Sequence, residues 1–588
     1  MTIPASEESA REEDPADQAG ADSSGSDSTE EKPGLGARAA GWAQAYGARF
    51  SFTGMVVAAA LGALSLSPSL LPRGPLFQGI VTGGSAALGY GVGVFLMWFA
   101  RFMVSRTEPW PHRPRSWWTT LAVVDIAALA GMTIGFAFWQ RDLRGMMGVE
   151  QLPPSAYPMM FLLELAFFAL FMAFGQGWGA LVRMLSRWFS RWLPRRIAAG
   201  LGGLLVVTIT IMAINGVVFD RLMGTVRSAF ENINDEYEPT EAATPSAFRS
   251  GGPNSQVTWS DLGMYGRNFV AYAPTVEKLT EFNGAPATEP IRAYAGLYSA
   301  PDIEENAEVA AAELERLGGL KRKVVGVGTS TGRGWVNEVT MSSLDYMYNG
   351  DTAMVSLQYS TLPSFLSFLL DQDRARRAGL ALFEAVDRRI NALPPEERPK
   401  VVVFGESLGT FGGEAAFGSI GSMVSRTDGA LFAGPTFGNT IWGDLVENRD
   451  AGSPMWRPVY RKGEHVRFGA GPADLRRVQE PWHSSRVVYV QHPSDPVTWF
   501  SPKLLFQKPD WLKGERGPDV LPAMRWIPIV SFLQVAADLA VAGNVSDGHG
   551  HVYIEAIPYA WDAILQPEGW DDEKSRRLGG TLQSHTDG

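Results

Sequence analysis

The segment VVVFGESLGT, residues 401–410, carries residue types suited to nucleophilic chemistry. Four apolar residues precede Gly405, and Ser407 lies between two glycines in a G-x-S-x-G pattern. A buried strand, a sharp turn and a helix in this order present a serine hydroxyl above a parallel sheet, where it can attack a carbonyl carbon. Glycines suit such a turn because the backbone passes too close for larger side chains. The segment therefore predicts a nucleophile at Ser407.

A second G-x-S-x-G match lies upstream at residues 328–332 and also follows an apolar run. Two matches in one glycine-rich chain show that the pattern alone is weak, so the neighbouring sequence must separate them. Ser407 is followed by LGTFGGEAAFGSIGSM, whose small and apolar residues suit a helix beneath the turn. Ser330 is followed by TGRGWVNE, whose glycines oppose a helix. These contexts favour Ser407.

The loop after the earlier apolar run has a different predicted role. In enzymes with this type of turn, the residue after the nucleophile and the loop after an early strand supply backbone N–H groups that bind an oxyanion. We assign this role to the amides of Leu408, Thr329, Ser330, Thr331 and Gly332. For Ser330, a plain turn in a glycine-rich loop is the alternative.

A serine hydroxyl is a weak nucleophile at neutral pH, so it needs a base that a carboxylate orients. Asp495 follows the strand-like run at residues 486–491, and we expect it to be this carboxylate. His549 and His551 lie in the glycine-framed loop GHGH, just before the amphipathic stretch VYIEAIPYAWDAIL. We favour His551 as the base because it lies nearer to the predicted helix, and His549 stays an alternative.

The other histidines and the absence of cysteine limit which further catalytic, metal or disulfide sites the chain can contain. His492 lies three residues before the predicted acid and is a further alternative base, although a histidine so close to the acid is more often structural. We expect His465 and His483, in a Pro- and Trp-rich insertion, to be surface or lid residues. The chain has no cysteine, which excludes disulfides and Cys-ligated metals. The His-x-His spacing at 549–551 lacks nearby acidic ligands, so we expect no metal and no cofactor.

Strand-like and helical patterns alternate in the C-terminal half and predict how these residues are positioned. Apolar runs suited to strands lie at residues 291–297, 323–328, 352–358, 400–404, 429–433 and 486–491, and helical patterns lie between several of them, at 302–317 and 373–393. This alternation predicts an α/β fold with a mostly parallel sheet and helices on both faces. The order Ser407, Asp495, His551 is the order of catalytic residues in α/β-hydrolases.

The N-terminal half belongs to a different class of sequence. Five apolar runs of about 20 residues, the length that crosses a bilayer core of roughly 30 Å, lie at 50–71, 76–100, 117–139, 158–182 and 197–219. We predict five transmembrane helices, of which the first is shortened by Pro68 and Pro72. Gly89 and Gly93 form a G-x-x-x-G pattern in the second run, which favours close helix packing.

Loop charge predicts the orientation of these helices. The segment before the first run and the second-to-third and fourth-to-fifth loops carry eleven arginines: Arg38, Arg49, Arg101, Arg106, Arg113, Arg115, Arg183, Arg187, Arg191, Arg195 and Arg196. The opposite set carries five: Arg73, Arg141, Arg144, Arg221 and Arg227. The positive-inside rule therefore predicts a cytoplasmic N-terminus and an extracytoplasmic C-terminal domain in the cell membrane. The prediction inverts if the first run does not span.

Charge and composition complete the division into domains. The first 32 residues contribute −8 of the net charge of −11, and their Ser-, Ala- and acid-rich sequence predicts disorder and argues against nucleic-acid binding. We divide the chain into five parts: an acidic disordered tail (1–35), a transmembrane helical domain (36–222), a connector (223–290), a catalytic domain (291–575) and a second disordered tail (576–588).

The chain resembles the α/β-hydrolase family typical of actinobacterial membrane proteins, in which a multi-helix membrane domain precedes a hydrolase domain. The resemblance rests on SLSPSLLPR (65–73), IRAYAGLYSA (291–300), GESLGTFGGEAAF (405–417), GPTFGN (434–439), RDAGSPMWRPVY (449–460), QHPSDPVTWFSP (491–502) and GHGHVY (548–553). It covers nearly everything except the acidic tail. It implies a Ser-Asp-His triad of Ser407, Asp495 and one of His549 or His551, and it does not supply the substrate.

These features predict a membrane-anchored serine esterase or lipase that acts on a lipid or acyl ester and contacts the bilayer. Three alternatives stay open: an acyltransferase that uses an alcohol acceptor, a peptidase of the same fold, and a non-catalytic hydrolase-fold binding module in a membrane complex. Oligomeric state is not predicted from the sequence.

Overall fold

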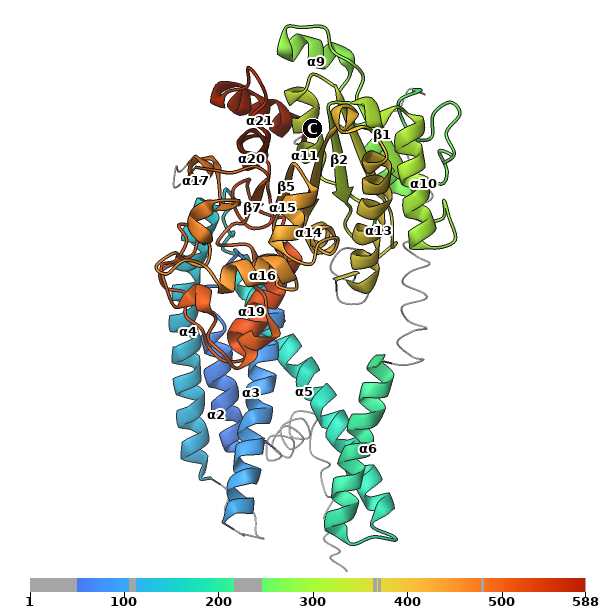
Figure 1. Cartoon of the computed structure of the whole chain (residues 1–588). Coiled ribbons are helices and arrows are strands. Elements are labelled where there is room, and N and C mark those ends of the chain that lie inside the picture. Colours follow the sequence, from blue (N-terminus) through green and yellow to red (C-terminus); the bar gives the residue numbers. More distant parts are fainter. Residues whose placement is uncertain are drawn as a thin grey trace, which may run out of the picture. The chain divides into compact units, whose positions relative to one another are not determined.

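The apolar runs of the C-terminal half form a seven-stranded sheet in the computed structural model (Figure 1). The spatial order is β1-β3-β2-β4-β5-β7-β6, and all neighbouring strands are parallel. The strands are β1 (Ile291–Ala295), β2 (Val324–Thr329), β3 (Thr352–Leu357), β4 (Lys400–Glu406), β5 (Gly429–Ala433), β6 (Val466–Gly469) and β7 (Arg486–Val490). Every residue of β1, β2, β3 and β5 is buried, as expected for strands covered on both faces. The predicted α/β fold is confirmed.

Two apolar clusters cover the two faces of this sheet. Along β4, Val403 belongs to one cluster, whereas Val402 and Phe404 belong to the other, because successive side chains of a strand point to opposite faces. One face is covered by α10 (Ile303–Arg316), α13 (Gln372–Asn391), α14 (Leu408–Glu414), α15 (Ile420–Arg426) and α16 (Thr440–Glu447). The other is covered by α8 (Gly263–Ala271), α11 (Glu338–Met347), α20 (Ala556–Leu565) and α21 (Asp572–Thr586).

Shorter helices lie in the connections. They are α9 (Val276–Asn283), α17 (Pro472–Leu475), α18 (Pro496–Trp499) and α19 (Val530–Asp538). Two elements differ from the sequence prediction. Strand β6 has only four residues at the edge of the sheet, too few to give a recognisable pattern. The predicted C-terminal disordered tail is wrong over most of its length, because α21 continues to Thr586 and buries Leu578 and Leu582.

The structure describes residues 50–104, 113–215, 246–362, 367–368, 372–476 and 481–586. The predicted acidic tail, the end of the fifth apolar run and the arginines at 221 and 227 lie outside these ranges. The described residues from Phe52 onward form one compact unit, which contains both the N-terminal helices and the sheet.

The five N-terminal apolar runs form α2 (Phe52–Leu64), α3 (Pro75–Met103), α4 (Arg115–Met146), α5 (Ala156–Phe189) and α6 (Arg195–Asn215). Among the described residues, α3, α4 and α5 are long and apolar enough to cross a membrane. Helix α2 has 13 residues, about 20 Å at 1.5 Å per residue, so the predicted first span is too long. The apolar part of α6 in the described residues is also short, at Ile197–Met212.

Helices α2 and α3 pack closely, as their glycine spacing predicted. A Cβ added at Gly89 would lie 2.7 Å from Val57 O, and one added at Gly93 would lie 2.6 Å from Thr53 O. Only glycine allows the two backbones to approach this far, so the G-x-x-x-G pattern has a packing role.

Candidate active site

Ser407 lies in a sharp turn between β4 and α14. Its backbone has φ 55° and ψ −123°, a conformation that residues with a side chain rarely adopt. The Ser407 amide donates to Ala433 O at 3.0 Å, which ties the turn to the end of the neighbouring strand β5. A buried strand, a strained serine and a helix follow one another as the sequence predicted. The geometry therefore presents Ser407 at the carboxyl edge of the sheet.

The two glycines that flank Ser407 permit this turn. A Cβ added at Gly405 would lie 2.4 Å from Gly409 O, and one added at Gly409 would lie 2.3 Å from Thr329 O. Both contacts involve backbone atoms, which cannot move aside cheaply. The glycines are therefore required by the close approach of α14 to β4 and to the end of β2.

The second G-x-S-x-G match has a different structure. Ser330 is buried, and its hydroxyl donates to Leu357 O at the end of β3, at 2.7 Å. No helix begins at this serine: α11 starts eight residues later, at Glu338. The Ser330 hydroxyl therefore holds two neighbouring strand ends together.

The predicted oxyanion loop lies beside the turn of Ser407, as the contact between Thr329 and Gly409 shows. One of its amides is already used, because the Thr331 N–H donates to Trp335 O at 2.8 Å. Leu408 is the first residue of α14, where the first N–H groups of a helix have no intrahelical acceptor. The Leu408 amide thus fits the predicted role better than the Thr331 amide does.

Asp495 follows β7 and lies at the start of α18, fully buried. Its carboxylate accepts four hydrogen bonds, of which the shortest come from His551 Nδ1 and the Tyr553 hydroxyl, both at 2.7 Å from Oδ2. The others come from the Val497 amide at 2.8 Å and the Thr498 hydroxyl at 3.2 Å. These donors fix both the carboxylate and the imidazole that it contacts.

Charge coupling sets the protonation of this pair. Burial alone would raise the pKa of Asp495, but the charge and the hydrogen bond of His551 lower it below its ordinary value. Burial disfavours the imidazolium of His551, but Asp495 outweighs this effect and raises the pKa of His551 above its ordinary 6.5. A base with this property suits proton transfer near neutral pH.

His551 lies at the same sheet edge as Ser407. A Cβ added at Gly434 would lie 2.3 Å from His551 Cε1, so the imidazole packs directly on the backbone that follows β5. The preceding residue, Ala433, accepts the amide of Ser407. His551 Nε2 is buried and has no hydrogen-bond partner among the described residues, and no Ser407–His551 hydrogen bond is present there. Such bonds are often long without substrate.

Family models match both halves of the chain. The model described as an alpha/beta-hydrolase family matches residues 291–578, and the model described as the N-terminus of an alpha/beta-hydrolase family matches residues 66–274. The chain belongs to this alpha/beta-hydrolase family. No curated protein and no solved structure matches it.

The other histidines of this alpha/beta-hydrolase have separate partners. His549 Nδ1 lies 3.4 Å from a carboxylate oxygen of Asp519, away from Asp495. His492 is buried, stacks on Tyr553 at 4.2 Å between ring centroids, and contacts Gly550 O through Nδ1 at 3.0 Å. Burial lowers the pKa of His492. Of the three candidate bases, only His551 has its imidazole hydrogen-bonded to the Asp495 carboxylate in the described part of the chain.

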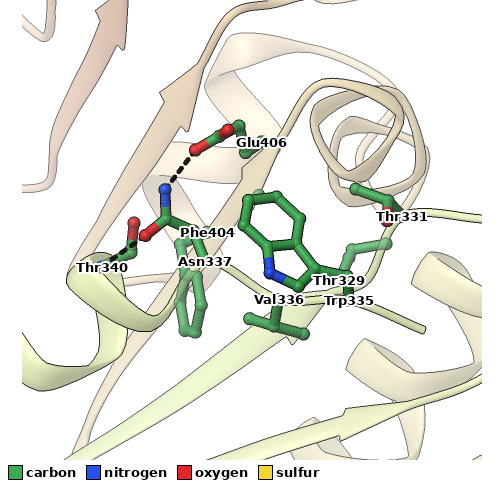
Figure 2. A pocket seen from close by; sticks show the side chains of 9 residues that line it. Thr329, Thr331, Trp335, Val336, Asn337, Thr340, Phe404 and Glu406 are labelled. Atoms are coloured by element: carbon green, nitrogen blue, oxygen red, sulfur yellow. Dashed lines mark hydrogen bonds between the residues drawn. The ribbon is translucent and has the colours of Figure 1, made fainter. Parts of the chain in front are cut away.

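Sequence reasoning missed a buried carboxylate directly beside Ser407, that of Glu406. It accepts a hydrogen bond from the Asn337 amide, as Figure 2 shows, and burial raises its pKa to about 7. Asn337 also caps α11 by accepting the amide of Thr340 at 3.2 Å. A small pocket lies here, lined by Thr329, Thr331, Trp335, Val336, Asn337, Thr340, Phe404, Gly405 and Glu406. The available signal for Glu406 was the acidic residue at the second position of G-E-S-L-G.

One group of potential metal ligands occurs among the described residues. Ligand atoms of Glu464, His465 and His483 all lie within 4.8 Å of one another. His483 Nδ1 lies 3.3 Å from Glu464 Oε1, and this direct side-chain contact accounts for the proximity of the two residues. The group belongs to the predicted Pro- and Trp-rich insertion, and neither His549 nor His551 is part of it.

Proposed function

We propose that this chain is a membrane-anchored serine hydrolase that cleaves an ester-type substrate through an acyl-enzyme. The observation that carries the proposal is the strained turn at Ser407, which lies at the same sheet edge as the Asp495–His551 pair. A plain loop serine has no reason to combine positive φ, two sterically required glycines and a carboxylate-bound histidine nearby.

In the proposed mechanism, His551 Nε2 accepts the proton of the Ser407 hydroxyl while Oγ attacks the ester carbonyl carbon. Asp495 holds Nδ1 protonated and stabilises the imidazolium. The tetrahedral intermediate collapses as the imidazolium donates its proton to the leaving alkoxide, and an acyl-enzyme remains. Water then attacks this ester with His551 as base, releasing the carboxylic acid and restoring Ser407.

The developing oxyanion needs two or more N–H donors near Ser407. We assign the first to the Leu408 amide, at the start of α14. The loop at 329–332 is the source of the second, with the Thr331 amide set aside because Trp335 O already accepts it. His549, the alternative base, is set aside because it contacts Asp519.

A row of phenylalanines supports an apolar acyl group in the substrate. Phe411, one turn after the nucleophile, contacts Phe368, and ring contacts continue through Phe437 and Phe500 to Phe532 of α19, with centroid separations of 5.1–6.4 Å. The four rings beyond Phe411 are half-buried, as they would be if an alkyl chain could lie against them. Tryptophans near these phenylalanines in the sequence are buried in the core, which favours a packing role over a lid: Trp442, Trp456, Trp499 and Trp511.

Two loop contacts support an extracytoplasmic catalytic domain. The loop between α2 and α3 and the end of α4 both contact the hydrolase part, through Ser69 and Asp538 and through Met147 O and the Ser546 amide. These loops are arginine-poor, whereas the loops at the opposite helix ends carry nine arginines, from 101–115 and 183–196. Unlike the count of spans, this arginine distribution does not depend on α2. Protease added to intact spheroplasts should therefore cleave the catalytic domain; full protection would contradict this orientation.

The enzymatic proposal is tested by labelling the full-length protein in detergent with a fluorophosphonate probe. We expect covalent labelling of the native chain and of Ser330→Ala, and none of Ser407→Ala. Retained labelling of Ser407→Ala with loss in Ser330→Ala would show that the wrong serine was chosen. Product analysis with water or an alcohol acceptor then distinguishes a hydrolase from an acyltransferase.

A further inference from the structure

The loop at residues 65–73, between α2 and α3, is buried although it belongs to the N-terminal helical region. Leu66, Ser69, Leu70, Leu71 and Arg73 are each 0% exposed. Leu70 and Leu71 belong to the same apolar cluster as one face of the hydrolase sheet. A surface connection between two membrane helices has no reason to enter another core, so this loop has a role beyond joining them.

The polar groups of this loop converge on Asp538, the last residue of α19. The Ser69 hydroxyl donates to Asp538 Oδ2, and the Leu70 amide donates to the same oxygen at 3.1 Å. Arg73 Nε lies 3.7 Å from Asp538 Oδ1, and both side chains are fully buried. A buried ion pair of this kind is costly to form and costly to break, so it fixes the elements that carry it.

A second residue of α19 strengthens this attachment. The Gln534 side-chain amide donates to Ser67 O at 2.8 Å and to Ser65 O at 3.1 Å. The loop itself is held from the other side by α4, because Gln140 accepts the Arg73 amide at 3.0 Å and Arg144 donates to Arg73 O at 3.1 Å. Hydrogen bonds thus attach helix α19 to the loop at residues 65–73, which is itself hydrogen-bonded to α4.

Helix α19 leads directly to the loop that carries the candidate base. A short helix at Leu539–Val541 follows it, and Ala542 O accepts the amide of His551 at 2.8 Å. The loop at 65–73 also reaches this point, since a Cβ added at Gly550 would lie 2.6 Å from Ala542 O and 3.4 Å from Leu71 Cδ2. Only a few covalent and hydrogen-bonded steps separate Ser69 from His551.

We infer that the loop at residues 65–73 positions the histidine loop, so that the α2–α3 hairpin completes the candidate active site as well as attaching it to the membrane. The inference rests on the proposed function for its catalytic meaning. Ser69 and Arg73 are positioning residues: they hold Asp538, α19 and Ala542 O, and thereby the backbone of His551. Loosening them misplaces the imidazole relative to Ser407 while the rest of the sheet stays folded.

A second buried ion pair in the same domain offers a matched control. Arg292 of β1 and Asp345 of α11 are paired and buried, and the Thr352 hydroxyl donates to Asp345, just as the Ser69 hydroxyl donates to Asp538. Ser69→Ala and Thr352→Val therefore each remove one hydroxyl from a buried carboxylate–arginine pair. Only the first pair leads to His551.

The test uses the full-length chain in detergent and measures the rate constant of fluorophosphonate labelling per labelled site. This rate constant does not depend on the fraction of folded protein, so a merely structural loss leaves it unchanged. We expect Ser69→Ala to slow labelling about tenfold and Arg73→Met to slow it by up to about a hundredfold, because small displacements of a catalytic group are costly. Thr352→Val should stay within about twofold of the wild type, since it is independent of the histidine loop.

Hydrogen exchange supplies a readout that needs no activity. The amide of His551 is bonded to Ala542 O, so a peptide covering residues 542–553 should exchange about fivefold faster in Ser69→Ala and at the wild-type rate in Thr352→Val. Wild-type exchange and wild-type labelling rates in Ser69→Ala and Arg73→Met would overturn the inference. Equal slowing by Thr352→Val would overturn it too. If the native protein is not labelled at all, the proposed function fails, and exchange alone decides whether the loop holds His551.

Discussion

The two G-x-S-x-G segments of this chain have the same residue pattern and opposite structures. At residues 405–409 the serine lies at φ 55° between a strand and a helix, and its side chain makes no capping hydrogen bond to that helix. At residues 328–332 the serine is buried, and its hydroxyl donates to Leu357 O. A nucleophile needs a presented and unoccupied hydroxyl, whereas a structural serine has its hydrogen bond satisfied.

The two segments also lie in direct contact. Thr329 O, at the end of β2, occupies the space next to Gly409. The segment at residues 328–332 therefore packs against the turn at Ser407. The segment at Ser407 is therefore distinguished by the helix that begins after the serine, whereas the segment at Ser330 is distinguished by the hydrogen bond of its hydroxyl. The glycines do not distinguish it, because both segments contain them.

The proposed difference between the two serines is tested most directly by replacing each serine separately. Ser407→Ala should lower kcat for a p-nitrophenyl ester by about 10⁴-fold or more, because no acyl-enzyme can form. The melting temperature should change little. An ester hydrolysis assay on the purified full-length protein checks the rate, and residual activity above about a tenth of the wild type would be incompatible with Ser407 as nucleophile.

The next largest difference in kcat is expected between variants of Asp495, which contacts His551, and Asp519, which contacts His549. Asp495→Asn should lower kcat by roughly 10³–10⁴-fold, because the tautomer and orientation of His551 are lost. Asp519→Asn alters the partner of His549 and of the Ser494 hydroxyl but leaves the Asp495–His551 pair intact, so it should keep kcat within about tenfold of the wild type. Steady-state kinetics of both variants decide between the histidines: the opposite ranking would make His549 the base.

The pH profile sharpens the role of Glu406. His551 must be neutral to accept a proton, and the negative charges of Asp495 and Glu406 raise its pKa, so kcat/KM should fall as the pH drops through this raised value. Glu406→Gln removes one of these charges and should move the acid limb toward lower pH, with a smaller change in kcat than Asp495→Asn causes. A shift of the limb toward higher pH in Glu406→Gln would show that the carboxylate acts in another way.

The smallest effect on rate is expected for Ser330→Ala. The backbone amide remains, so kcat should stay within about fivefold of the wild type, whereas the loss of a buried hydrogen bond should lower the free energy of unfolding by about 1 kcal/mol. Chemical denaturation and the ester assay on the same preparation separate the two quantities. A large loss of rate without loss of stability would give Ser330 a direct catalytic role.

Much of the α/β fold was predictable because its strands are buried on both faces and read as continuous apolar runs. The predicted runs at 352–358 and 429–433 correspond closely to β3 and β5. Helix α21 was missed because it is polar overall and buries only a few residues, among them Leu578 and Leu582, near a chain end. The first predicted span was too long because apolar sequence continues past Leu64 into a loop that the hydrolase core, and not lipid, covers.

The site was predictable to the extent that its chemistry is local in sequence. The turn at Ser407 and the glycine-framed His551 carry recognisable patterns, whereas Asn337 and Tyr553 act through contacts with residues 58 or more positions away. The choice between His549 and His551 depended on which carboxylate each one meets. The sequence does not show which histidine pairs with which carboxylate, because the pairs form only when the loop after β7 packs against the histidine loop.

The most direct test of the account is to identify the residue that a fluorophosphonate modifies in the full-length, folded protein. Peptide mapping by mass spectrometry should place the adduct on Ser407, and Asp495→Asn should slow its formation strongly. An adduct on Ser330, or no adduct in a preparation shown to be folded, would contradict the claim that the turn at Ser407 carries the catalytic nucleophile.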